Sequence, residues 1–133
     1  MSIEDTEFMK QAYGMLYDLE NQLRKVISIT MTEEYGSGWL IQAPLTNLYK
    51  PYRKNFSRFY LHELVSMLSS YECFSEIFKV KEIAQLKSIL PIRNKIAHCK
   101  LITKEELRLL SYVLGFVNET AHSIVFVNQK INN

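Results

Sequence analysis

Residues 8–30 read FMKQAYGMLYDLENQLRKVISIT, and the spacing of their apolar side chains indicates how the chain folds. Apolar or small residues recur every three or four positions, at Phe8, Ala12, Leu16, Leu19, Leu23, Val26 and Thr30. This spacing lines them along one face of an α-helix, because a helical turn takes about 3.6 residues. The pattern predicts an amphipathic helix from about residue 4 to about residue 32, with its apolar face buried.

The same kind of spacing marks three further helices. The apolar positions are Leu61, Leu64, Val65 and Leu68, then Val80, Ile83, Leu86 and Leu90, and finally Leu107, Leu110, Leu114, Val117, Ala121 and Ile124. Thr103 followed by Glu106 is typical of a capping box, which would open the last helix. Gly36, Gly38 and Pro44 interrupt the chain after the first helix. Since no long segment alternates with a period of two, we expect an all-α, up-and-down bundle of four to five helices.

Composition limits the classes of protein to which the chain can belong. Hydrophobic residues make up 47% and charged residues 23% of the 133 residues, the balance of a globular chain rather than a disordered one. This length fits one domain, residues 1–133. The acidic N-terminus and the lack of a continuous apolar stretch of about 20 residues predict a cytoplasmic protein without a membrane span. Cys73 and Cys99 are expected to be reduced thiols.

The sequence lacks the residues of several familiar kinds of functional site. His62 and Glu63 are followed by Ser66, where a zinc-binding helix would carry a second histidine. The glycines at 36 and 38 lack the third glycine of a dinucleotide-binding fingerprint, and no phosphate-binding loop is present. We therefore expect neither a metal nor a cofactor. His62 and His122 are most simply histidines on a helix face or in the core.

Positive charge is unevenly distributed. Two segments hold no acidic residue, 35–62 and 83–104, and their cations are Lys50, Arg53, Lys54 and Arg58, then Lys87, Arg93, Lys95, Lys100 and Lys104. Segregated charge of this kind can concentrate a polyanion even though the net charge is only +2. The alternative is two solvated faces whose acidic residues lie elsewhere.

Residues 91–100, PIRNKIAHCK, lie inside the second acid-free segment. On an ideal helix Arg93, Asn94, Lys95 and His98 share an arc, while Ile89, Ile92 and Ile96 lie opposite it. Pro91 is expected to start this turn and His98 to stand at the helix exit. The helix dipole favours a histidine at a helix C-terminus, and this would be a structural explanation of His98. The dipole would not explain Arg93 and Asn94.

The sequence resembles the HEPN superfamily. IRNKIAHCK is similar to the motif of that superfamily, in which an arginine, usually followed by a polar residue, precedes a histidine by four to six positions. LYDLENQLRKVI is similar to the family's Glu…Leu-Arg pattern, and YGSGW to the Tyr-Gly…Trp that often follows it. The segments FYLHELVSML, FSEIFKVKEIAQLKSILPIRNKIAH and LITKEELRLLSYVL resemble the central and closing helices. The resemblance covers about residues 13–120, and is strongest to small HEPN domains of defence and RNA-processing systems.

This resemblance implies a homodimer that places two Arg–His pairs in one cleft and acts as a metal-independent endoribonuclease. RNA supplies its own nucleophile, the 2′-OH, so the protein needs a proton donor or acceptor and positive charge. His98 would move the proton, Arg93 would hold phosphate oxygens, and Asn94 would support them. Lys95 and Lys100 would bind RNA. An antitoxin or a nucleotidyltransferase is a possible partner, since many members belong to toxin–antitoxin or phage-defence systems.

The chain also departs from part of the family. Lys100 stands where some toxin members carry a tyrosine that their partner modifies, so the chain lacks the residue for control by that route. Some members are non-catalytic dimerisation or RNA-binding modules, which is the alternative function for this chain.

A second candidate RNA-binding segment is YKPYRKNFSRFY, residues 49–60, which mixes cations with aromatic rings. Such a mixture suits single-stranded RNA, because rings stack on bases and cations bind phosphates. The alternative is that Phe56, Phe59 and Tyr60 are core residues at the entry of the next helix, and we favour it slightly for these rings. For Lys50, Arg53 and Lys54 we favour RNA binding.

Overall fold

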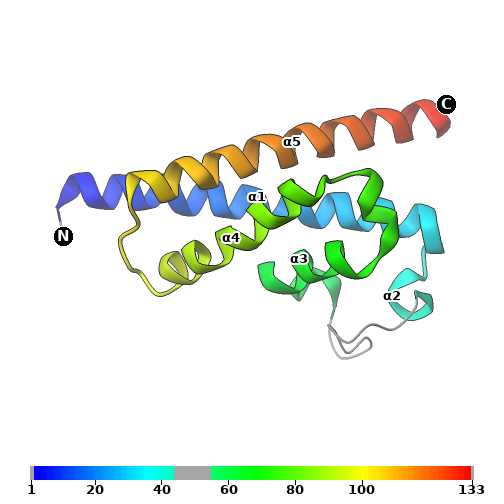
Figure 1. Ribbon diagram of the computed structural model, residues 1–133, viewed down its shortest axis with the longest axis horizontal. Helices are drawn as coiled ribbons and strands as arrows, with labels where there is room; N and C mark the ends of the chain where they lie inside the picture. The colour runs from blue at the N-terminus through cyan, green and yellow to red at the C-terminus, as the bar shows by residue number, and fades with distance from the viewer. Residues whose placement is uncertain (1, 44–54, 133) are drawn as a thin grey trace.

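The computed structural model describes residues 2–43 and 55–132, and these residues form an all-α fold (Figure 1). The α-helices are α1 (Ile3–Tyr35), α2 (Trp39–Gln42), α3 (Leu61–Ser70), α4 (Val80–Ala97) and α5 (Lys104–Asn132). Two short 3-10 helices, η1 (Phe56–Arg58) and η2 (Glu72–Glu76), flank α3. No strand occurs in the described ranges, so the prediction of an all-α chain is confirmed there.

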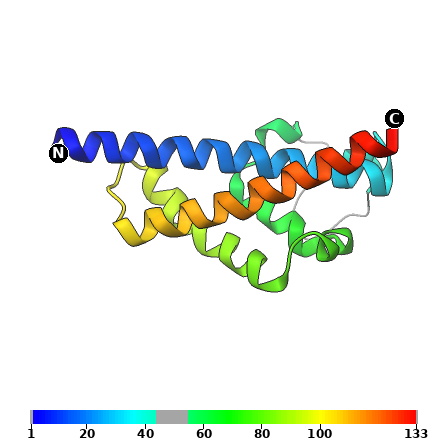
Figure 2. The ribbon, with the colours of Figure 1, turned by 90° about the horizontal axis from the view of Figure 1, so that it is seen from above.

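The two longest helices, α1 and α5, lie side by side and run in the same direction (Figures 1 and 2). We expected the alternating order of an up-and-down bundle, and this parallel pair departs from it. The reason is the length of the middle helices. With 10 residues, α3 is about 15 Å long and cannot cross the bundle. Only α4 runs back along the bundle. Because this one antiparallel helix separates α1 from α5, these two helices run in the same direction.

The first helix matches the sequence pattern closely. The side chains of Ala12, Leu16, Leu19, Leu23, Val26 and Thr30 are buried, and Phe8 is half-buried. Ser2 and Asp5 cap the N-terminus reciprocally, with Asp5 N–H donating to Ser2 Oγ at 3.0 Å and Ser2 N–H donating to Asp5 Oδ2 at 3.4 Å. The helix ends at Gly36, whose φ of 88° is easily adopted only by glycine.

One expectation about the third predicted helix was wrong. Pro91 does not start a turn but lies inside α4, although proline cannot donate the backbone hydrogen bond of that turn. Ile89 and Ile92 are both buried, and their burial on either side of Pro91 holds the helix together across the missing bond. Val80 is 87% exposed because it occupies the first position of α4, before the helix reaches the core.

The capping box before α5 is confirmed. Thr103 N–H donates to Glu106 Oε1 at 2.9 Å, and Glu106 N–H donates to Thr103 Oγ1 at 3.1 Å. Leu110, Val117 and Ala121 are buried, as is Val113. By length and composition alone, the span Lys104–Val127 is long and apolar enough to cross a membrane, a test that a core helix also passes. The absence of a membrane span therefore stays a prediction.

Candidate active site

Three helical segments meet at the guanidinium of Arg93. Its Nε atom lies 3.8 Å from Oε1 of Glu20, in the middle of α1. Its Cζ atom lies 5.7 Å from the centre of the Tyr60 ring, immediately before α3. The Arg93 side chain is 28% exposed, so part of the guanidinium can be reached from solvent by an anion.

His98 stands at the end of α4, as expected, and its side chain is exposed. The chain turns immediately after it, because Cys99 has the left-handed φ of 58°. Cys99 N–H donates to the Ile96 carbonyl at 3.1 Å, and Lys100 N–H donates to the Lys95 carbonyl at 2.8 Å. These two bonds are those of a Schellman motif. They close the helix below His98 and leave its imidazole in solvent.

Arg93 and His98 do not contact one another within the chain. Residues five apart on an ideal helix have Cα atoms about 9 Å apart and point about 140° away from each other. Ile89, Ile92 and Ile96 are buried and Asn94 and His98 are exposed, as the helical arc predicted. Arg93 lies at the border of that exposed arc, against α1. The structure therefore departs from the predicted shared arc, because Arg93 turns toward α1 while Asn94 and His98 face solvent, so one protomer presents the two motif residues on different sides of α4.

The two motif lysines differ in their surroundings. Lys95 Nζ pairs with Glu106 Oε2 at 2.9 Å, so its charge is engaged by the capping box of α5. The Thr103 backbone N–H, and then Lys95, hold the pKa of Glu106 below its ordinary value. Lys100 is exposed. The other cations predicted to bind RNA, Lys50, Arg53 and Lys54, lie outside the described residues.

Sequence reasoning missed the partners of Arg93. Glu20 belongs to the Glu…Leu-Arg pattern on which the resemblance rests, but no role was predicted for it, and Tyr60 was predicted to be a core ring. Tyr60 is instead 55% exposed. Phe59 is buried and Phe56 half-buried, with an edge-to-face contact between their rings at 5.2 Å. The core alternative was correct for these two residues. The exposed Tyr60 directly after them belongs to the surface beside Arg93.

Arg24 holds the entry of α3 against α1. Its Nη2 donates to the Phe59 carbonyl at 2.9 Å, and its Nη1 donates to Asn21 Oδ1 at 3.1 Å. Phe59 directly precedes Tyr60 in the chain. The hydrogen bond from Arg24 to the Phe59 carbonyl therefore fixes the position of the Tyr60 backbone. The Glu…Leu-Arg pattern in the first helix thus supplies two residues of this neighbourhood: Glu20 beside Arg93, and Arg24 beneath Tyr60.

An apolar groove lies beside His98. It has a volume of about 380 Å³ and is lined by Thr6, Met9, Lys10, Tyr13, Ile96 and Cys99. Tyr13 and Tyr17, one turn apart on α1, are both mostly exposed. The groove therefore joins the N-terminal part of α1 to the end of α4, next to the motif histidine.

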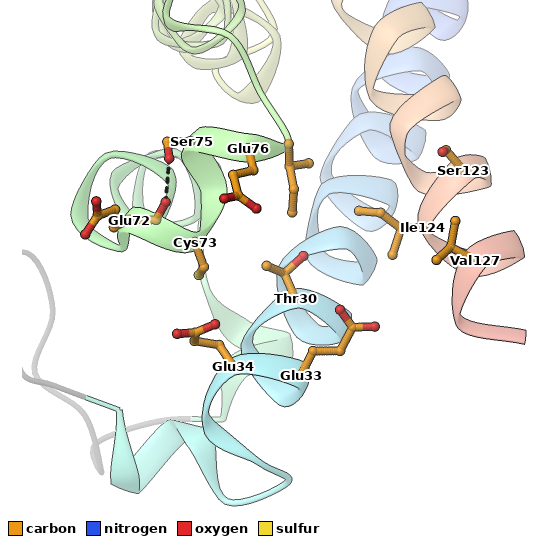
Figure 3. Close-up of a pocket in the computed structure, with 11 residues that line it drawn as sticks. Thr30, Glu33, Glu34, Glu72, Cys73, Ser75, Glu76, Ser123, Ile124 and Val127 are labelled. Carbon is orange, nitrogen blue, oxygen red and sulfur yellow. Dashed lines mark hydrogen bonds between the residues drawn. The ribbon is translucent and has the colours of Figure 1, made fainter. Parts of the chain in front are cut away.

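A cavity of about 520 Å³ near the other end of α1 has the opposite character (Figure 3). Glu33 and Glu34 of α1 line it together with Glu72 and Glu76 of η2. Four carboxylates repel phosphate, so this cavity is unsuited to RNA. Burial, and then the nearby Glu34 carboxylate, raise the pKa of the Cys73 thiol in its wall.

The described side chains contain no group of three or more histidine, cysteine or acidic residues that could hold a metal ion. Comparison of the chain with protein-family models, curated proteins and solved structures finds no match. Function is therefore argued from the residues around Arg93 and His98.

Proposed function

We propose that the protein is a metal-independent endoribonuclease of the HEPN type, with Arg93 and His98 as catalytic residues in a homodimer. The observation that carries this proposal is the setting of Arg93. Its Nε atom lies 3.8 Å from Oε1 of Glu20 and its side chain is 28% exposed, on the same helix as an exposed histidine at the motif spacing. A guanidinium that reaches solvent can donate hydrogen bonds to two phosphate oxygens.

The reaction would use the 2′-OH of RNA as the nucleophile on the adjacent phosphate. His98 would accept the 2′-OH proton or donate one to the leaving 5′-oxygen, because imidazole titrates near neutral pH. Arg93 would stabilise the charge that develops on the phosphate oxygens. The products would be a 2′,3′-cyclic phosphate and a free 5′-hydroxyl. Asn94 is exposed beside His98 and would support the phosphate by hydrogen bonding.

A second copy of the chain would complete this site. One protomer offers one histidine in the motif, and Arg93 and His98 lie on different sides of α4. The apolar groove beside His98 is where a second copy would dock, because burying Tyr13, which is 62% exposed, removes apolar surface from water. Docking at this place would bring two copies of His98 close together and supply both an acid and a base.

The alternative is a non-catalytic HEPN-type module that dimerises, or that binds RNA or a protein partner such as an antitoxin. One observation favours it. The carboxylate of Glu20 lies beside Arg93, so the arginine already has an opposite charge within the fold and need not act on a substrate.

Cleavage of RNA in the presence of a chelator distinguishes the two functions. Wild type, His98→Ala and Arg93→Ala are incubated with a mixed-sequence RNA in EDTA, and His122→Ala, an exposed histidine on α5, is the matched control. We expect a loss of about 10²–10⁴-fold for His98→Ala and a comparable loss for Arg93→Ala, with His122→Ala unchanged. Arg93→Lys should restore only part of the activity.

DNA of the same sequence should stay intact, because it lacks the 2′-OH. An inactive wild type, or motif variants as active as wild type, would favour the non-catalytic module. Circular dichroism melts of each variant establish that a lost activity is not a lost fold.

A further inference from the structure

The cavity near the C-terminal end of α1 gathers negative charge from two elements (Figure 3). Glu33 and Glu34 of α1 and Glu72 and Glu76 of η2 line it, and all four residues are exposed. None of these carboxylates forms an ion pair with another described residue. The net charge of the chain is +2, so any attraction of the cavity for cations comes from these local charges and not from the protein as a whole.

The side chain of Thr30 adds a buried polar group to the wall of this cavity. Thr30 is only 6% exposed, and Figure 3 shows it between Glu33 and Glu34. Its hydroxyl has no hydrogen bond to a described residue, whereas the hydroxyls of Thr6 and Thr120 each donate to the carbonyl four residues earlier. A buried hydroxyl without a partner costs free energy. A ligand that donates a hydrogen bond to Thr30 would remove this cost.

The arrangement of the carboxylates favours an extended organic cation over a metal ion. Among the described side chains, no three acidic, cysteine or histidine residues are placed to hold a metal. Apolar side chains complete the wall, namely Ile77 at the end of η2 and Ile124 and Val127 on α5. The volume of about 520 Å³ is within the range of small-molecule pockets, roughly 300–1,000 Å³. Ammonium groups separated by methylenes match this wall, because the charges can pair with carboxylates while the methylenes contact apolar side chains.

We propose that this cavity binds an aliphatic polyamine that bridges α1 and η2. One ammonium group lies between Glu33 and Glu34 and donates to the hydroxyl of Thr30, since an ammonium has three N–H donors. A second ammonium group pairs with the carboxylates of η2. The inference is independent of the proposed function, because this cavity and the groove beside His98 lie near opposite ends of α1.

Isothermal titration calorimetry with spermidine at low ionic strength and pH 7 measures the binding. We expect one spermidine per chain. The double variant Glu34→Gln with Glu76→Gln removes one carboxylate from each wall and should weaken binding at least about tenfold. The matched control is Glu105→Gln with Glu119→Gln, which removes two exposed charges on α5 outside the cavity. This control should bind as wild type, and an equal loss in both double variants would mean that only the overall charge matters, which overturns the proposal.

The hydroxyl of Thr30 provides a test that does not change the charge. Thr30→Val keeps the shape of the side chain, and we expect it to weaken spermidine binding about fivefold through the lost hydrogen bond. Thr30→Ser keeps the hydroxyl and should stay within about twofold of wild type. An unchanged Kd in Thr30→Val would show that the buried hydroxyl does not contact the ligand, and would overturn the site as proposed.

Thermal melts establish that the variants are folded and report binding a second time. Spermidine should raise Tm for wild type and for the α5 control, because it binds only the folded chain, and should raise it less for Glu34→Gln with Glu76→Gln. Without ligand this variant should melt no lower than wild type, since it removes like charges that face one another. If it does not fold, Thr30→Val and Thr30→Ser decide the question.

Two other cations identify the class of ligand. Magnesium chloride should bind at least about tenfold more weakly than spermidine, because no described group of side chains is placed to hold a metal. Equal binding of Mg²⁺ with the same losses in the variants would make this a metal site and overturn the proposal. Acetylated trilysine amide carries the same charge as spermidine. Tighter binding of this peptide would assign the cavity to a basic protein partner and overturn the polyamine. A wild type that binds no spermidine refutes the inference and leaves the proposed function untouched.

Discussion

Arg93 and Glu20 join α4 to α1 through an ion pair of 3.8 Å between Nε and Oε1, with both side chains mostly buried. The distance is too long for a hydrogen bond, so the attraction between opposite charges, and not a directed bond, holds Arg93 beside α1. The carboxylate occupies the Nε side of the guanidinium. The Arg93 side chain is 28% exposed, so an anion from outside the fold can reach part of the guanidinium.

Removing this carboxylate should separate binding from catalysis. In Glu20→Gln, we expect kcat for RNA cleavage to fall about tenfold, because the guanidinium loses its orientation. KM should stay equal or fall, because one negative charge leaves the neighbourhood of the phosphate. Steady-state kinetics measure both constants, and Glu119→Gln, an exposed acid on α5, serves as control. A rise in KM at unchanged kcat would contradict a positioning role.

The apolar groove beside His98 should carry the dimer contact. Light scattering at micromolar concentration should give about twice the chain mass of 15.6 kDa for wild type, because an apolar groove favours burial. Tyr13→Glu places a charge in the groove and should yield a monomer that no longer cleaves RNA. Tyr112→Glu, with a comparably exposed tyrosine on α5, should remain a dimer. A monomeric wild type would remove the composite site.

The Schellman turn after His98 offers a stabilising substitution. Cys99 adopts φ 58°, which costs a residue with a Cβ about 1 kcal/mol relative to glycine. Cys99→Gly should therefore raise the free energy of unfolding by about 1 kcal/mol in urea denaturation. Cys99→Ala keeps the Cβ and should show no such gain. Equal stabilities for the two variants would mean that the turn relaxes without cost.

The capping box at Thr103 and Glu106 should give stability that depends on pH. The pKa of Glu106 is lowered in the fold, so its contribution is present above the unfolded pKa of about 4.3 and is lost as the pH falls below it. Glu106→Ala should lower the free energy of unfolding by about 1 kcal/mol at pH 7. The difference from wild type should shrink at pH 3. Because neither alanine nor glutamine titrates, the cost of Glu106→Gln should change with pH by the same amount as that of Glu106→Ala, and it should be smaller at pH 3 because the amide oxygen can still accept from the Thr103 N–H.

The two cysteines should differ in their reaction with iodoacetamide. The pKa of Cys73 is raised by burial and by Glu34, so little thiolate is present at pH 7.5, whereas Cys99 is exposed. In the Tyr13→Glu monomer, where the groove that Cys99 lines is open, we expect Cys99 to be alkylated about tenfold faster than Cys73, as followed by mass spectrometry of the peptides. Glu34→Gln should speed the reaction at Cys73 only, with Cys99 in the same molecule as internal control.

Local patterns in the sequence predicted local features of the fold. Apolar spacing identified the buried face of α1, and the Thr103–Glu106 pair identified the start of α5. Each of these depends on residues within one or two turns of one another, so the local chain carries the information. Pro91 was misjudged because the burial of Ile89 and Ile92, a property of the whole fold, outweighs one missing hydrogen bond.

The sequence by itself determined that the chain is helical, which faces are apolar, and that Arg93 and His98 share one helix with His98 at its exit. Only the tertiary structure decided that Arg93 faces Glu20, that Tyr60 lies on the surface beside it, and that α1 and α5 run parallel. The physical reason is separation along the chain. Helix periodicity links neighbours three or four residues apart, whereas Glu20, Tyr60 and Arg93 meet only because three helices pack around one core.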